Sequence, residues 1–79
     1  MNLKQIVADI LKLPQQDINE ELSPQTFPEW TSLKHIQLIT TVEDAYNVKF
    51  TLKEMKSLKN YAAFITILKS KGIGDEVFA

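Results

Sequence analysis

Residues 30–46, "WTSLKHIQLITTVEDAY", form the longest amphipathic stretch of this 79-residue chain and decide its fold. Apolar side chains recur with a helical period, which predicts a helix from about Ser32 to Tyr46. The repeating residues are Leu33, Ile36, Leu38, Ile39, Val42, Ala45 and Tyr46. They cover an arc of roughly 220° around the helix axis. So wide an arc predicts a helix packed among several others, with Leu33 as the start of the buried stripe.

The residues before this stretch predict a shorter helix and a long loop. A helix is expected over residues 3–13 from the spacing of Leu3, Ile6, Val7, Ile10 and Leu11. Asn2 and Gln5 occupy the positions of a capping pair at its start. Pro14 ends it, and the proline-containing stretch that follows carries three scattered apolar residues, Ile18, Leu22 and Phe27. These are expected to pin a long, ordered loop over the core.

The residues after it predict two more helices. "TLKE" at 51–54 has the form of a capping box and predicts a short helix over about 52–57. Asn60 is placed to cap a last helix, whose stripe is Tyr61, Phe64, Ile65 and Leu68. The alternative reading of "VKFTL" at 48–52 as a strand leaves that strand without a partner. We therefore predict an all-α domain of four helices over residues 1–72, with a flexible tail at 73–79.

Composition narrows the function classes. Nine basic and ten acidic residues give a net charge of −1 without a basic cluster, which disfavours nucleic acid as a partner. The chain has no cysteine and one histidine, which disfavours disulfides and structural metal sites. No apolar run is long enough to span a membrane, and the first residues do not resemble a signal peptide. We expect a soluble, cytoplasmic protein.

The arrangement resembles the acyl carrier proteins and the closely similar peptidyl carrier domains over residues 1–71. The match begins in a W-x-S-L stretch at the start of the second helix, here Trp30, Ser32 and Leu33. It continues along that helix at Ile36, Leu38, Ile39, Val42, Glu43 and Tyr46. It extends through "FTLKEMKSL" and "NYAAFITIL" in the third and fourth helices. The resemblance implies a carrier-type four-helix bundle with a short third helix and a long loop between the first two.

The resemblance also implies a function. A phosphopantetheinyl transferase would attach 4′-phosphopantetheine from coenzyme A to Ser32, and the arm's thiol would carry acyl or aminoacyl groups as thioesters. An acyl-activating ligase or acyltransferase would load the arm, and downstream biosynthetic enzymes would unload it. The chain itself would be a freestanding, monomeric, non-catalytic carrier. The residues implied to contact partners are Thr31, Leu33, Lys34, Gln37, Glu43, Asp44 and Met55. Those implied to shelter cargo are Ile39, Val42, Phe50, Met55, Leu58 and Tyr61.

Two departures from the family pattern leave an alternative open. Thr31 stands where the family usually has aspartate; it can still cap the helix, which leaves Ser32 free, but it brings no charge. The second helix is also poor in acid near its start. An unmodified helical interaction module with the carrier architecture is therefore the alternative function.

His35 lies on the helical face of Ser32, which raises the possibility of a serine hydrolase. We expect instead that His35 packs near Trp30 or touches the arm, because no third catalytic group is evident. The lysines 53, 56, 59, 69 and 71 predict a solvated face or, less readily, a surface that complements an acidic partner.

Overall fold

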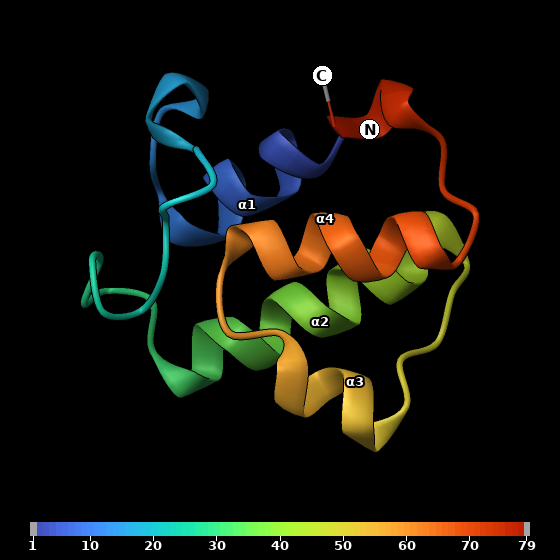
Figure 1. Cartoon of the computed structure of the whole chain (residues 1–79). Helices are drawn as coiled ribbons and strands as arrows, with labels where there is room; N and C mark the ends of the chain where they lie inside the picture. The colour runs from blue at the N-terminus through green and yellow to red at the C-terminus, as the bar shows by residue number, and fades with distance from the viewer. Residues whose placement is uncertain (1, 79) are drawn as a thin grey trace.

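The computed structural model describes residues 2–78, and within that range it contains four α-helices and no strand (Figure 1). The helices are α1 (Leu3–Leu11), α2 (Ser32–Tyr46), α3 (Leu52–Ser57) and α4 (Tyr61–Ser70). Short 3₁₀ turns lie at Gln15–Asp17 and Asp75–Phe78. The predicted all-α class, with four helices of which the third is short, is confirmed. Residues 48–51 are loop, so the alternative of a strand at 48–52 is not found.

Side-chain caps fix where the helices begin. The Asn2 side chain accepts a hydrogen bond from the Gln5 backbone N–H at 2.8 Å, and the Gln5 side chain accepts one from the Asn2 N–H at 3.0 Å. This is the predicted capping pair of α1. The helix ends at Leu11, two residues before the predicted end, because Lys12 takes up a left-handed conformation with φ 61°. The chain therefore turns before Pro14, and Lys12 rather than the proline ends the helix.

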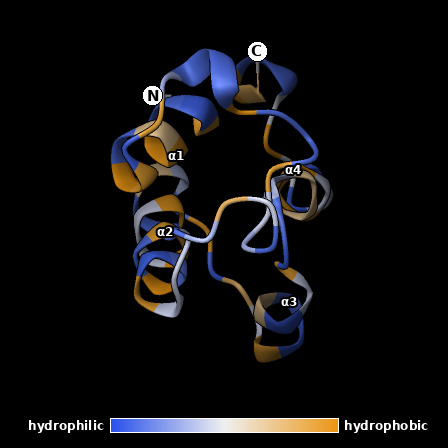
Figure 2. Cartoon of the chain, turned by 90° about the vertical axis from the view of Figure 1, so that its left-hand side faces the viewer, coloured by the Kyte–Doolittle hydropathy of each residue, from blue (hydrophilic) through white to orange (hydrophobic). Residues whose placement is uncertain are grey.

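The core lies between α1 and α2 on one side and α4 on the other (Figure 2). Its fully buried side chains come from all three helices and from the segments beside them: Leu3, Ile6, Val7, Leu38, Val42, Leu58, Tyr61, Phe64 and Leu68. The rings of Phe50 and Phe64 meet edge to face, with centroids 6.4 Å apart. These contacts pack α4 against α2 and against the segment that follows α2. They therefore determine where the start of α2 lies in the molecule.

The buried arc of α2 is narrower than predicted. Leu38, Ile39 and Val42 are buried, but Leu33 and Ile36 are 66% and 60% exposed. The helix has 15 residues, whereas α1 has nine and α4 has ten, so its neighbours do not cover its first turns. The prediction that Leu33 begins the buried stripe is therefore wrong. The apolar start of α2 faces solvent.

The long loop between α1 and α2 is pinned as predicted. Ile18 and Leu22 are buried, and Phe27 is half-buried against the core. The Leu22 carbonyl accepts a hydrogen bond from the Tyr61 backbone N–H at 3.0 Å, which satisfies one of the unpaired donors at the start of α4. The loop then delivers Trp30 to the core with only 2% exposure.

The segment after α4 has a defined position in the structure. Gly72, with φ 89°, turns the chain away from the helix, and Asp75–Phe78 pack beside α1 (Figure 1). The Lys69 ammonium lies 3.6 Å from the Asp75 carboxylate and 5.6 Å from the centre of the Phe78 ring. The domain boundary at residue 72 and the mobility of the tail stay predictions.

Candidate functional site

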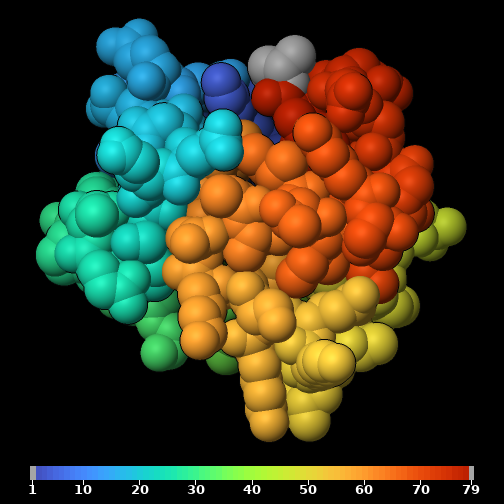
Figure 3. Space-filling model, in the orientation of Figure 1, coloured from blue at the N-terminus to red at the C-terminus, as the bar shows by residue number. Residues whose placement is uncertain are grey.

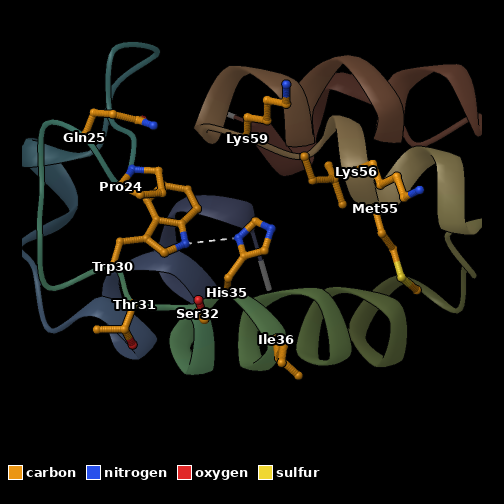
Figure 4. Close-up of a pocket in the computed structure, with 11 residues that line it drawn as sticks. Pro24, Gln25, Trp30, Thr31, Ser32, His35, Ile36, Met55, Lys56 and Lys59 are labelled. Carbon is orange, nitrogen blue, oxygen red and sulfur yellow. Dashed lines mark hydrogen bonds between the residues drawn. The ribbon is translucent and has the colours of Figure 1, made fainter.

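Ser32 occupies the first position of α2, with Thr31 as the residue that caps the helix. Thr31 has extended backbone, and its hydroxyl accepts a hydrogen bond from the Lys34 backbone N–H at 3.3 Å. Within residues 2–78 the Ser32 hydroxyl has no hydrogen-bond partner, and Figure 4 shows its oxygen on the same side of α2 as Trp30 and His35. The predicted division of roles is confirmed as far as the cap on Thr31 is concerned. The Ser32 oxygen lies at the positive end of the longest helix.

A groove of about 400 Å³ opens beside Ser32, between α2 and the segment that contains α3 (Figure 4). Trp30, Ile36, Met55 and Leu58 supply most of its apolar lining. Its polar lining includes Ser32 and His35 from α2, and Lys56 and Lys59 from the opposite wall. An extended organic group attached at Ser32 would therefore meet apolar surface and hydrogen-bond donors together.

Trp30 and His35 form one wall of this groove. The indole Nε1–H of Trp30 donates a hydrogen bond to His35 Nδ1 at 3.1 Å, and the two ring centres are 5.8 Å apart. They are the residue before the cap and the fourth residue of the helix, the positions at which a staple joins loop to helix. The His35 ring also meets the edge of Phe64 at 6.0 Å. The expectation that His35 packs near Trp30 is confirmed.

This hydrogen bond fixes the chemistry of His35. Because Nδ1 accepts the indole proton, the neutral ring carries its own proton on Nε2. Burial lowers the pKa of His35, which favours this neutral form. The ring therefore has no free lone pair with which to take the proton of Ser32. In this geometry His35 positions Trp30 and offers Nε2–H as a donor, and it does not act as a general base.

The residues expected to contact partners divide into two groups. Thr31, Leu33, Gln37 and Asp44 are exposed, whereas Lys34, Glu43 and Met55 are half-buried. Glu43 has a structural contact, because its Oε2 accepts a hydrogen bond from the Phe50 backbone N–H at 2.9 Å. This bond secures the connection from α2 to α3.

The residues expected to shelter cargo also divide. Met55 and Leu58 line the groove, while Ile39, Val42, Phe50 and Tyr61 lie in the core with at most 9% exposure. The Tyr61 hydroxyl is buried without a hydrogen-bond partner among the described residues, and burial raises its pKa to about 12.

The sequence interpretation did not assign Ile36, Lys56 and Lys59 to the groove. The position of Ile36, four residues after Ser32, was the available signal. Lys56 reaches the groove from the end of α3 and Lys59 from the turn after it, and no local pattern specifies where these segments lie relative to α2.

Among the described residues, no three His, Asp or Glu side chains are grouped as metal ligands. None of the described helices is long and apolar enough to cross a bilayer. Comparison with protein-family models found no match, and comparison with curated proteins found none either. Functional interpretation therefore rests on the Ser32 motif and its surroundings.

Proposed function

We propose that this chain is a carrier protein of the acyl or peptidyl carrier type, modified on Ser32 with 4′-phosphopantetheine. The observation that carries the proposal is the free hydroxyl of Ser32 at the first position of α2, next to a separate capping residue, Thr31. A serine that capped the helix would have its oxygen committed to a backbone N–H. Ser32 keeps its oxygen available for a covalent bond.

The modification is a phosphoryl transfer. Ser32 Oγ attacks the phosphorus of coenzyme A that bears the pantetheine. A new Oγ–P bond forms, the bond to the other phosphate breaks, and 3′,5′-adenosine diphosphate leaves. The transferase takes the hydroxyl proton, because the ring of His35 has no free acceptor nitrogen. When attached, the arm would supply a terminal thiol able to carry acyl groups as thioesters, and Ser32 would be the residue that holds it.

The helix end suits the modified serine electrostatically. A phosphodiester on Ser32 would lie near the unpaired backbone N–H groups and the positive end of α2. Such an end favours an exposed anion by about 0.3–1 kcal/mol. That energy orients the start of the arm but does not hold the whole arm in place, as a carrier that visits several enzymes requires.

Intact mass measurement tests the proposal. The protein is incubated with coenzyme A and a broad-specificity phosphopantetheinyl transferase, and we expect the mass of one phosphopantetheine to be gained. Ser32→Ala should abolish the gain. Ser57→Ala is the matched control, because Ser57 is an exposed serine in α3 that bonds only to the Lys53 carbonyl, and it should be modified normally.

A second variant separates transferase recognition from the serine itself. If the native chain is modified slowly, Thr31→Asp should raise the rate by restoring the acid that the family usually has at this position. No mass gain in either the native chain or Thr31→Asp would contradict the proposal and favour the unmodified interaction module. A gain that persists in Ser32→Ala would contradict the assignment of the site.

A further inference from the structure

The surface around Ser32 combines lysines and exposed aliphatic side chains. We call it the Ser32 face and define it by Leu33, Ile36, Lys56 and Lys59. Lys56 and Lys59 line the groove together with Ser32, and no acidic residue lines it. Figure 4 shows both lysines on the far side of the groove from α2. Glu29, in the turn before Trp30, is the acid nearest to Ser32 along the chain, and it does not line the groove.

These lysines are not neutralised by ion pairs. The ion pairs of the described residues join Lys69 to Asp75 and Lys71 to Glu54. Glu54 is the acid of α3, and its Oε1 lies 2.8 Å from the Lys71 ammonium and also accepts the Thr51 N–H. Glu54 is thus committed to these partners, and Lys56, two residues further along α3, does not share its helical face. In Figure 3 the connection from α3 to α4 projects at the lower edge of the molecule, between the surfaces of α2 and α3.

The aliphatic residues of the face are unusually open to solvent. Leu33 and Ile36 are two of three large apolar side chains that the structure leaves more than half exposed. They stand three residues apart on α2, so they are neighbours on one helical surface. A contiguous apolar patch beside a candidate modification site marks a contact surface more often than an isolated exposed leucine does.

We infer that the Ser32 face docks a protein surface in which carboxylates surround an apolar pocket. Leu33 and Ile36 would enter the pocket, and Lys56 and Lys59 would pair with the carboxylates at its rim. The inference rests on the proposed function, because the partner would be an enzyme that loads or unloads the arm. It gives the partner a definite sign of charge, since the complementary surface must be acidic.

A protein partner fits these features better than a lipid or nucleic acid surface. Two aliphatic side chains supply too little apolar area to hold a helix in a membrane interface, which requires a full apolar face. Trp30 is buried, so the face has no aromatic platform on which a base could stack. A small apolar contact within a charged rim is the usual anatomy of a transient protein interface.

The inference is tested with the unmodified, ¹⁵N-labelled full chain and two synthetic helical peptides of equal length. Both peptides carry leucines on one face; one carries glutamates on the other face and the second carries lysines. We expect the glutamate peptide to bind about tenfold more tightly, with the largest amide shifts at Leu33, Ile36 and Lys56, and to weaken as salt is added. Vesicles of anionic phospholipid form a third arm and should leave these amides unshifted.

Charge reversal provides the matched control. Lys56→Glu/Lys59→Glu should weaken binding of the glutamate peptide about tenfold, while Lys4→Glu/Lys12→Glu, with the same change in net charge near α1, should not. Equal binding of the two peptides, shifts that map elsewhere, or vesicle binding at the same amides would overturn the inference. Because the titration needs no modification of Ser32, its failure and the failure of the mass experiment are distinguishable.

Discussion

Helices α1 and α3 both begin with a complete capping box, yet the protein holds them in different ways. In α1, five of nine residues are buried, and they pack against the central core. In α3, none of the six residues is buried. The capping box defines a helix in both places, but full burial of helix residues accompanies it only in α1, whereas α3 contributes the half-buried Met55 to the edge of the core. Local sequence thus specifies that α3 is helical without fixing it firmly to the rest of the molecule.

The position of α3 is set by residues on either side of it. Phe50 before the helix and Leu58 after it are buried, with 6% and 1% exposure. Glu43 holds the Phe50 N–H, and Lys71 pairs with Glu54. A helix anchored at its ends and weakly packed along its length opens at a lower free energy than the core does. Since α3 forms one side of the groove, the groove is expected to widen without loss of the fold.

The largest loss of stability should come from shortening a buried side chain of α1. Leu3 is fully buried, so Leu3→Ala should lower the free energy of unfolding by about 2–5 kcal/mol, measured by urea denaturation. Met55 of α3 is half-buried, and Met55→Ala should cost less than about 2 kcal/mol. Equal losses for the two variants would show that α3 is as firmly packed as α1.

The next effect concerns the wall of the groove. His35→Phe leaves the buried indole N–H of Trp30 without an acceptor, which should cost about 1–3 kcal/mol. His35→Gln retains an acceptor and is the control; it should recover part of the loss. If His35→Phe is as stable as the native chain, the indole N–H has found another acceptor. The Trp30–His35 hydrogen bond would then not be what holds this wall of the groove.

The same residue makes stability depend on pH. Burial lowers the pKa of His35 in the folded state, so the unfolded chain takes up the proton first as pH falls. The contribution of the neutral ring is complete above the ordinary pKa of about 6.5 and is lost as pH falls through the folded-state value. Urea midpoints measured from about pH 7.5 to about pH 5 should fall in the native chain and fall less in His35→Phe.

Removal of a helix cap should lower the stability of the capped helix by about 1 kcal/mol. The part of the molecule that is affected should differ between α1 and α3. Thr51→Ala should speed hydrogen exchange of the α3 amides and leave the α1 amides near their native rates, because α3 opens separately. Asn2→Ala should instead lower the stability of the domain as a whole, since α1 is part of the core. Amide exchange followed by NMR distinguishes the two patterns. If Thr51→Ala speeds amide exchange throughout the chain, α3 does not open separately from the core, and the two helices do not differ in this respect.

The smallest effect is expected at the Lys71–Glu54 pair. The hydrogen bond from Lys71 and that from the Thr51 N–H lower the pKa of Glu54 below its ordinary value of 4.5. The stability that this gives is present above that value and is lost as pH falls through the folded-state pKa. Glu54→Gln should therefore be slightly less stable than the native chain at neutral pH, with the difference shrinking in acid. The stability of the two proteins is compared by thermal unfolding from neutral pH into acid. A difference that stays constant over this pH range would contradict the role assigned to the Glu54 carboxylate.

Much of the fold followed from the sequence because helices are local objects. The caps at Asn2, Thr31 and Thr51 depend on residues within one turn, and each was predictable. The end of α1 was misplaced because Lys12, with no glycine or asparagine to signal it, adopts the left-handed conformation. The exposure of Leu33 and Ile36 was missed because helical spacing reports amphipathicity and not the length of the neighbours.

The site was only partly predictable for a related reason. Ser32 and Thr31 were assigned from adjacent residues, and the contact of His35 with Trp30 follows from their staple positions. The groove joins residues from the loop, α2, α3 and the turn after α3, so its lining depends on tertiary placement. Of the cargo residues implied by the resemblance, four belong to the closed core, because the resemblance carries over positions and not how deeply each is buried here.

The hydrogen bond from Tyr61 N–H to the Leu22 carbonyl has a kinetic consequence. It joins the long loop to the first turn of α4 across more than a third of the chain, so the Tyr61 N–H gains this acceptor only when the loop is in place. Closing so large a segment is slow compared with the growth of a helix. In refolding followed by pulsed hydrogen exchange, the Tyr61 amide should gain protection after the central amides of α2, and its appearance would time the arrival of the loop that carries Trp30 and Ser32 into place.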